Sequence, residues 1–167
     1  LNENELLNVY TIALTKSPIL ANNGLKVVAD YTLDNCPKTD YLIIPGGSGT
    51  RALLKNAPFL EWINQTASCC DHILSVCSGS LVLAVTGLLN GLSATTHHQV
   101  FDELTALAKE TRIIRNKRFV DNGKILTSAG VSAGIDMSLY MVRKLYGEKT
   151  AFKVAQYIEY NYSPESV

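Results

Sequence analysis

Two short apolar runs, each closed by a glycine-containing turn, constrain the fold of this chain more than any other feature. Tyr41 to Ile44 ends in Pro45-Gly46-Gly47, and His72 to Val76 runs directly into Cys77, with Gly79 two residues later. Runs without polar alternation fit parallel strands that are buried on both faces. Because a helical pattern follows each run, the sequence predicts an α/β fold, with a mainly parallel sheet covered by helices on both faces.

The rest of the chain continues this alternation. We predict further strands at residues 8–14, 25–31, 94–96, 112–115, 119–120 and 124–127. We predict helices in a segment ending near residue 67 and at 81–89, 132–146 and 149–160. The sequence has no internal repeat and no linker-like tract, so we expect one domain over residues 1–167.

The charge of the chain is balanced, with 15 Lys and Arg against 15 Asp and Glu. This balance argues against broad electrostatic binding to nucleic acid or to an anionic membrane. The basic run from Arg112 to Arg118 is interpreted as a solvated strand edge or turn. The longest apolar stretch, Leu81 to Leu89, is too short to span a bilayer. The four cysteines lack disulfide-like spacing, which predicts a reducing cytosol.

Cys77 lies between a buried strand and a helix, which is the layout of a nucleophile elbow. Small residues two positions before and after it, Ser75 and Gly79, suit a tight turn. A helix N-terminus favours the thiolate, which is the form that attacks an electrophilic carbon. The alternative is an inert, buried cysteine at a strand end. The strand–turn–helix context favours the nucleophile.

The loop at residues 45–50 follows the other buried strand, so it is predicted to face Cys77 at the same sheet edge. Gly46 and Gly47 allow backbone N–H groups to approach a ligand. We predict that the amides of Gly47 and Ser78 stabilise a developing oxyanion. The loop matches neither a Walker A motif nor GxGxxG, which argues against a phosphate cradle.

Histidine is the usual partner of a cysteine nucleophile. His72 begins the elbow strand at its far end, so we interpret it as structural. His97 follows residues 94–96 and is expected at the sheet edge that carries Cys77. The alternative for His97 is a surface-loop histidine. No Cys/His pair has zinc-like spacing, and we expect neither a metal nor a cofactor.

At these residues the sequence resembles the ThiJ/PfpI superfamily, with the class I glutamine-amidotransferase-like fold, and within it the isonitrile hydratase branch. The matching blocks are 40–50 (DYLIIPGGSGT), 75–80 (SVCSGS), 87–91 (GLLNG), 94–97 (ATTH), 127–136 (TSAGVSAGID) and 157–160 (YIEY). The resemblance implies a flavodoxin-like three-layer sandwich, a homodimer and a small-molecule substrate.

The resemblance also assigns roles to single residues. Cys77 falls on the elbow cysteine and His97 on a nearby histidine, while Ser78 replaces a threonine typical of the hydratase branch and keeps its hydroxyl. Three residues fall on the loop and helix start that border the pocket: Gly130, Val131 and Asp136. For Asp136 the alternative is a purely structural acid, since the helix dipole favours one in a first turn.

One family feature has no match here. The family begins with a strand and a turn bearing an acidic residue that hydrogen-bonds the elbow cysteine. Glu3 and Glu5 are too close to the next strand to be that acid. We therefore expect that an N-terminal segment carrying the acid and a central strand precedes Leu1.

Three functions follow from this pattern. The first is hydration of an isonitrile to an N-substituted formamide through a covalent Cys77 thioimidate. The second is glyoxalase-like chemistry or amide hydrolysis with the same nucleophile. The third is a ligand or oxidation sensor without turnover, because the same domain forms the sensing half of AraC-type regulators.

Overall fold

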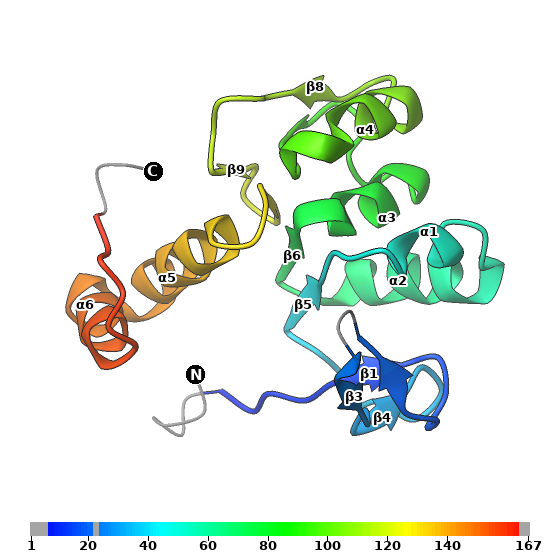
Figure 1. Cartoon of the computed structure of the whole chain (residues 1–167), viewed down its shortest axis with the longest axis horizontal. Coiled ribbons are helices and arrows are strands. Elements are labelled where there is room, and N and C mark those ends of the chain that lie inside the picture. The colour runs from blue at the N-terminus through cyan, green and yellow to red at the C-terminus, as the bar shows by residue number, and fades with distance from the viewer. Residues whose placement is uncertain (1–6, 22–23, 164–167) are drawn as a thin grey trace.

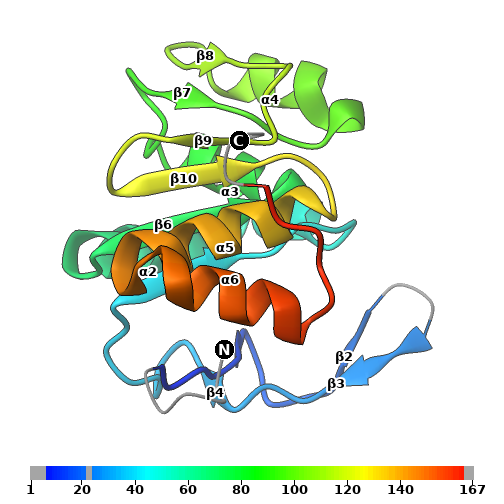
Figure 2. The ribbon, with the colours of Figure 1, turned by 90° about the vertical axis from the view of Figure 1, so that its left-hand side faces the viewer.

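The structure is a computed structural model that describes residues 7–21 and 24–163. Its centre is a four-stranded sheet in the order β5-β6-β10-β9 (Figures 1 and 2). These strands are β5 (Tyr41–Ile44), β6 (His72–Val76), β10 (Ile125–Ser128) and β9 (Phe119–Asp121). β6 is parallel to both β5 and β10, whereas β9 is antiparallel to β10. β5 and β6 have the predicted bounds.

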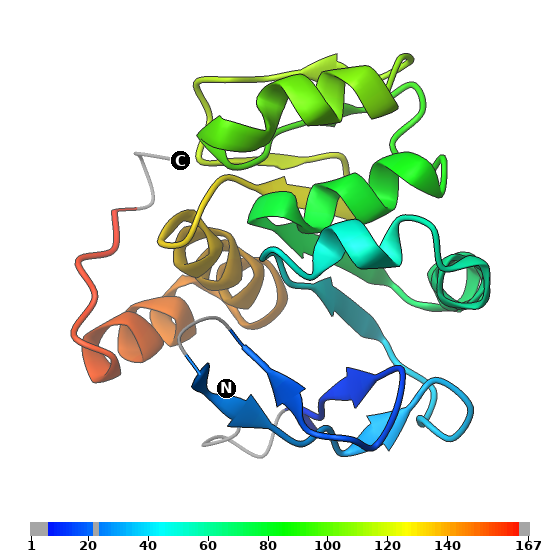
Figure 3. The ribbon, with the colours of Figure 1, turned by 45° about the vertical axis from the view of Figure 1, so that its right-hand side comes forward.

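Helices cover both faces of the sheet (Figures 1 and 3). One face carries α1 (Thr50–Leu53), α2 (Ala57–Cys69), α3 (Ser80–Val85) and α4 (Phe101–Leu107). The other face carries α5 (Ala133–Tyr146) and α6 (Glu148–Tyr157), which pack against each other (Figure 2). The predicted three-layer α/β fold is therefore confirmed.

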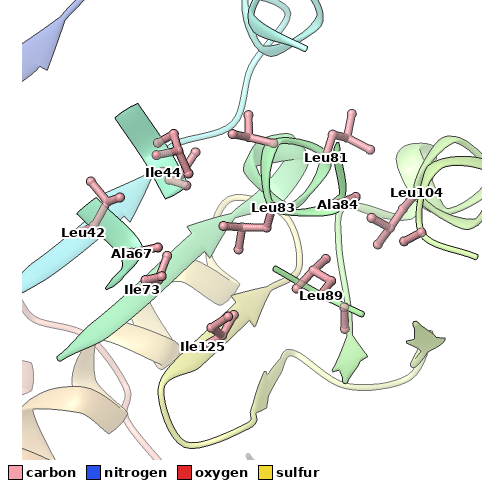
Figure 4. Close-up of a cluster of buried hydrophobic side chains, with 14 of the residues drawn as sticks. Leu42, Ile44, Ala67, Ile73, Leu81, Leu83, Ala84, Leu89, Leu104 and Ile125 are labelled. Atoms are coloured by element: carbon pink, nitrogen blue, oxygen red, sulfur yellow. The ribbon is translucent and has the colours of Figure 1, made fainter. Parts of the chain in front are cut away.

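The core lies on both sides of the central strands. Side chains alternate between the faces along a strand, so Ile73 and Leu74 of β6 enter different clusters. Figure 4 shows the larger cluster, which contains Ile73, Leu83, Leu89 and Ile125. Since both faces of β6 are buried, its continuous apolar sequence has a physical cause.

Small two-stranded pairs flank this sheet. These are parallel β1 (Ile12–Ala13) with β4 (Tyr31–Thr32), antiparallel β2 (Ile19–Leu20) with β3 (Lys26–Val27), and parallel β7 (Ser93–Ala94) with β8 (Arg112–Ile113). The strand predicted at 25–31 is thus wrong as one element. Asp30 accepts hydrogen bonds from the amide and hydroxyl of Thr11, and the chain bends there between β3 and β4.

Other predicted bounds also need correction. The strand predicted at 8–14 is only Ile12–Ala13, and the one predicted at 112–115 is only Arg112–Ile113. The strand predicted at 94–96 is Ser93–Ala94, because the Thr95 amide donates to Thr127 Oγ1 at 2.9 Å instead of joining the ladder. The helix predicted at 81–89 ends at Val85, two residues before Gly87 with its φ of 76°. The helix predicted to reach residue 160 ends at Tyr157. The sequence prediction also missed α4, although Phe101 and Leu104 have helical spacing and both are buried.

β5 is an edge strand of the sheet within residues 7–21 and 24–163. Ile43 on this strand is half exposed, so the prediction of burial on both faces is wrong for β5. No helix in the described part of the chain is long and apolar enough to cross a membrane.

Candidate active site

The backbone of Cys77 has the strained geometry of an elbow. Its φ of 55° lies in the left-handed region, which is uncommon for any residue other than glycine. The residue follows β6 directly and opens a 3₁₀ turn, Cys77–Gly79, that leads into α3. Its N–H donates to Ala129 O at 3.2 Å, and its carbonyl accepts from Thr96 Oγ1 at 2.8 Å. These contacts hold the conformation that the sequence pattern predicts.

Two glycines allow the loops after β5 and β6 to touch. A Cβ on Gly46 would lie 2.7 Å from Cys77 Cβ, and a Cβ on Gly79 would lie 2.2 Å from Ile44 O. Both distances are well below van der Waals contact. The structure therefore brings the Gly46 loop directly against Cys77, as the parallel arrangement of the two strands predicts.

The Ser78 hydroxyl joins these loops. Ser78 is 1% exposed, and its Oγ accepts from the Gly47 amide at 2.9 Å. Thr50 Oγ1 lies 3.3 Å from the same oxygen and donates to Gly47 O at 2.8 Å. Because the Gly47 amide already has this acceptor, an oxyanion would have to replace Ser78 Oγ there. The roles of the Gly47 and Ser78 amides stay predictions. Sequence reasoning missed Thr50, whose only signal was a hydroxyl at the end of the glycine loop.

A cavity of about 190 Å³ lies near the Cys77 backbone, although Cys77 is not one of its lining residues. Two of its lining residues form hydrogen bonds with the Cys77 backbone: Thr96 donates to the Cys77 carbonyl, and Ala129 accepts from the Cys77 amide. The remaining lining residues are His97, His98, Phe101, Arg115, Gly130 and Val131. The structure therefore brings together three of the predicted site residues, namely His97, Gly130 and Val131.

His97 is fixed in this cavity by close packing. A Cβ on Gly130 would lie 2.1 Å from His97 Cδ2. His97 Nδ1 accepts from the Gln99 amide at 3.3 Å, which assigns the proton of a neutral ring to Nε2. The hydrogen bonds described for His97 and Cys77 do not join the two side chains. A catalytic role for His97 stays a prediction.

The other notable histidine and cysteines lie away from this edge. His72 stacks on Tyr41 and lies 3.0 Å from Gly123 O through Nδ1, at the opposite end of β6. Cys70 is buried, and desolvation raises the pKa of its thiol. Within the described ranges, no group of three or more His, Cys, Asp or Glu side chains is arranged to hold a metal ion. Glu3 and Glu5 lie outside the described residues.

Asp136 lies in a polar network behind the cavity. Asp136 is 7% exposed, forms an ion pair with Arg118 and accepts from the Tyr160 hydroxyl at 2.9 Å. The hydrogen bond to Asp136 raises the pKa of Arg118. Arg118 Nη2 also donates to Ser132 Oγ at 3.0 Å, next to Val131. Asp136 is not among the lining residues of the cavity, and a role for it at the site stays a prediction.

Replacing Asp136 with asparagine is expected to lower the free energy of unfolding by about 2 kcal/mol. Breaking a buried ion pair costs roughly 3–5 kcal/mol, and the half-exposed guanidinium of Arg118 reduces that cost. Urea unfolding measures the change. Asp102→Asn, at a fully exposed carboxylate, is the control and should change stability by less than about 0.5 kcal/mol. Equal stability of the two variants would contradict the buried role.

A three-layer α/β sandwich with a cysteine at a strand–helix elbow and a facing glycine loop defines a flavodoxin-like protein. The DJ-1/PfpI family model matches residues 1–144, and the chain belongs to this family. The resemblance to the ThiJ/PfpI superfamily is thereby confirmed.

The chain is also similar to individual proteins of known sequence or structure. The chain is 35% identical over 150 residues to an isonitrile hydratase of Pseudomonas putida, covering 88% of this chain and 63% of that protein. It is 27% identical to the HTH-type transcriptional regulator CdhR of Pseudomonas aeruginosa, covering 91% of this chain and 45% of the regulator. The crystal structure of a THiJ/PfpI family protein from Pseudomonas syringae superimposes with a TM-score of 0.85 at 34% identity, covering 94% of this chain and 64% of that one. The chain thus spans less than two thirds of each.

Proposed function

We propose that the protein is a Cys77-dependent enzyme that acts on a small electrophilic carbon, and that its reaction is hydration of an isonitrile to an N-substituted formamide. The observation that carries this proposal is the left-handed backbone of Cys77, held against the Gly46 loop beside the Ser78 hydroxyl. The similarity to an isonitrile hydratase supports the choice of substrate. In line with the family resemblance, we also propose a cytoplasmic homodimer.

The chemistry requires one nucleophile, one proton and one water. The Cys77 sulfur adds to the terminal isonitrile carbon, which takes up a proton to give a thioimidate. Water then adds to the same carbon, the C–S bond breaks, and the formamide leaves with the thiol restored. The Ser78 amide and hydroxyl, with the Gly47 amide, would orient the substrate or the water at this loop.

Incubation with n-butyl isonitrile tests the proposal directly. We expect N-butylformamide to accumulate over many turnovers, measured by chromatography against an authentic standard. Formamide no faster than in the Cys77→Ala variant would overturn hydration as the reaction, while leaving the fold and the elbow geometry intact.

A sensor is the second candidate function. Its support is the 27% identity to an HTH-type transcriptional regulator, in an alignment that covers 91% of this chain and 45% of the regulator. Oxidation of Cys77 to a sulfinic acid by mild peroxide, without turnover of any small electrophile, would favour this candidate. Intact-protein mass spectrometry distinguishes the outcomes, since the sulfinic acid adds two oxygen atoms.

Removing the hydroxyl of Ser78 is expected to lower kcat/KM for formamide formation roughly ten- to hundredfold. The loss follows because the buried oxygen holds the Gly47 amide in place, and misplaced oxyanion donors cost rate on this scale. Steady-state kinetics of Ser78→Ala measure it. Ser138→Ala, which removes a hydroxyl bonded within α5, should leave the rate unchanged. An unchanged rate in Ser78→Ala would contradict the role.

A further inference from the structure

Arg115 is the one lining residue of the cavity beside Cys77 that carries a permanent charge. It belongs to the basic run from Arg112 to Arg118, which was predicted to be a solvated strand edge or turn, and it lies two residues after β8. The structure places this segment beside α4 (Figures 1 and 3). Arg115 of this run therefore lines the cavity, which the charge pattern of the run did not predict.

Two contacts hold the Arg115 side chain at the cavity. Its guanidinium carbon lies 4.8 Å from the centre of the Phe101 ring, a cation–π contact with a residue that also lines the cavity. Its Nη2 lies 3.1 Å from Asp102 Oδ1. Both partners are in the first turn of α4, so the guanidinium is held across the end of that helix.

The pairing with Asp102 is weak. The Asp102 side chain is 99% exposed and that of Arg115 is 58% exposed, and ion pairs between exposed groups contribute little. Among the described residues, the partners of Arg115 engage only Nη2 and the face of the guanidinium. Since a guanidinium has five N–H donors, it can bind a second acceptor in the cavity.

The charge of the cavity is one-sided. Its walls contain Arg115, two histidines and neutral residues, and no carboxylate among the residues that the structure describes. The nearest partner of opposite sign, Asp102, is outside this lining. The His97 ring offers Nε2–H as a further donor, because its Nδ1 accepts from Gln99. The cavity therefore presents positive charge and N–H donors next to residues that hold the Cys77 backbone, Thr96 and Ala129.

We propose that Arg115 binds a carboxylate of the substrate, so that Cys77 acts faster on small electrophiles with an acidic group than on neutral ones of similar size. A planar guanidinium suits a carboxylate because the two groups form charge-assisted hydrogen bonds. A cavity of about 190 Å³ has room for only a small molecule. This inference names a substrate class for the site in the proposed function, and it requires only that the Cys77 thiol be reactive.

Two alkylating agents of similar size test it without requiring turnover. Iodoacetate is an anion, whereas iodoacetamide is neutral. In both reactions the thiolate sulfur forms a bond to the methylene carbon while the C–I bond breaks and iodide leaves. Peptide mass spectrometry gives the rates at which the two agents alkylate Cys77. The ratio of the iodoacetate rate to the iodoacetamide rate, divided by the same ratio for glutathione, measures how strongly the site attracts the carboxylate.

We expect this normalised ratio to exceed one in the wild type and to fall roughly three- to fivefold in Arg115→Gln, the scale of one exposed ion pair. Asp102→Asn should raise the ratio, because it removes the competing carboxylate. Arg112→Gln removes the same charge from β8 outside the cavity lining and is the matched control, with no change expected. Added salt should shrink the difference between wild type and Arg115→Gln.

A ratio unaffected by Arg115→Gln, or affected equally by Arg112→Gln, would overturn the proposal. The outcome is separate from the fate of isonitrile hydration. If the alkylation ratio depends on Arg115 but no formamide forms, the carboxylate subsite stands and the reaction is another one. If formamide forms but isocyanoacetate has no advantage over its methyl ester in kcat/KM, the carboxylate subsite fails and the hydratase stands.

Discussion

Replacing Cys77 with alanine is expected to lower the rate of formamide formation by at least roughly a thousandfold. The proposed covalent route has no second nucleophile, and removal of a catalytic nucleophile typically has effects of this size or larger. Single-turnover measurements with excess protein give the residual rate. The change itself should be tolerated structurally, because alanine has a smaller side chain in the same tight turn.

Two controls make this result specific. Cys69→Ala removes an exposed thiol at the end of α2, outside the site, and should retain full activity. Circular dichroism should show the same fold in Cys77→Ala as in the wild type. A rate within tenfold of the wild type in a folded Cys77→Ala variant would show that another group performs the reaction.

The second large effect is expected on stability, from Gly79→Ala. The new Cβ would lie 2.2 Å from Ile44 O, 3.0 Å from Ile44 C and 3.1 Å from Pro45 O. All three atoms are backbone, so no side-chain rotation relieves the overlap. The end of β5 must move away from the elbow, and we expect the free energy of unfolding to fall by about 3–5 kcal/mol.

Urea unfolding with a fitted m-value measures this loss, and Gly49→Ala is the matched control. Gly49 lies in the facing loop with an ordinary φ of −62°, and a Cβ added to it would have no atom within 4 Å. Its substitution should change stability by less than about 1 kcal/mol. Equal losses in the two variants would mean that the contact between the two loops is not what Gly79 protects.

Sequence reasoning was most accurate at the centre of the sheet. β5 and β6 have the predicted bounds. For β6 the reason is burial on both faces, which needs an uninterrupted apolar sequence, whereas β5 keeps its apolar sequence although Ile43 is half exposed. It was least accurate at the N-terminal strands, where Ile19, Leu20 and Val27 are exposed in the β2–β3 hairpin. Apolar residues there do not reflect burial in this fold, so their pattern could not define the strands.

In the candidate site, too, some features were predicted from the sequence and others were not. The order strand, cysteine, glycine and helix predicted the elbow, and the left-handed φ of Cys77 agrees with it. Thr50 and Arg115 were not singled out. Their neighbours in the site, Ser78 and Phe101, are distant in the chain, and no local spacing relates them.

The sequence by itself therefore determined the elbow at Cys77, because a tight turn between a buried strand and a helix is a local property of consecutive residues. Only the tertiary structure decided what surrounds that cysteine. Three features depend on how the parallel strands and α4 pack: the close packing of Gly79 against Ile44, the hydrogen bond of the Gly47 amide to Ser78, and the guanidinium at the cavity. Such contacts join residues from separate elements, and their distances follow from the packing of the sheet and helices, which no short sequence pattern specifies.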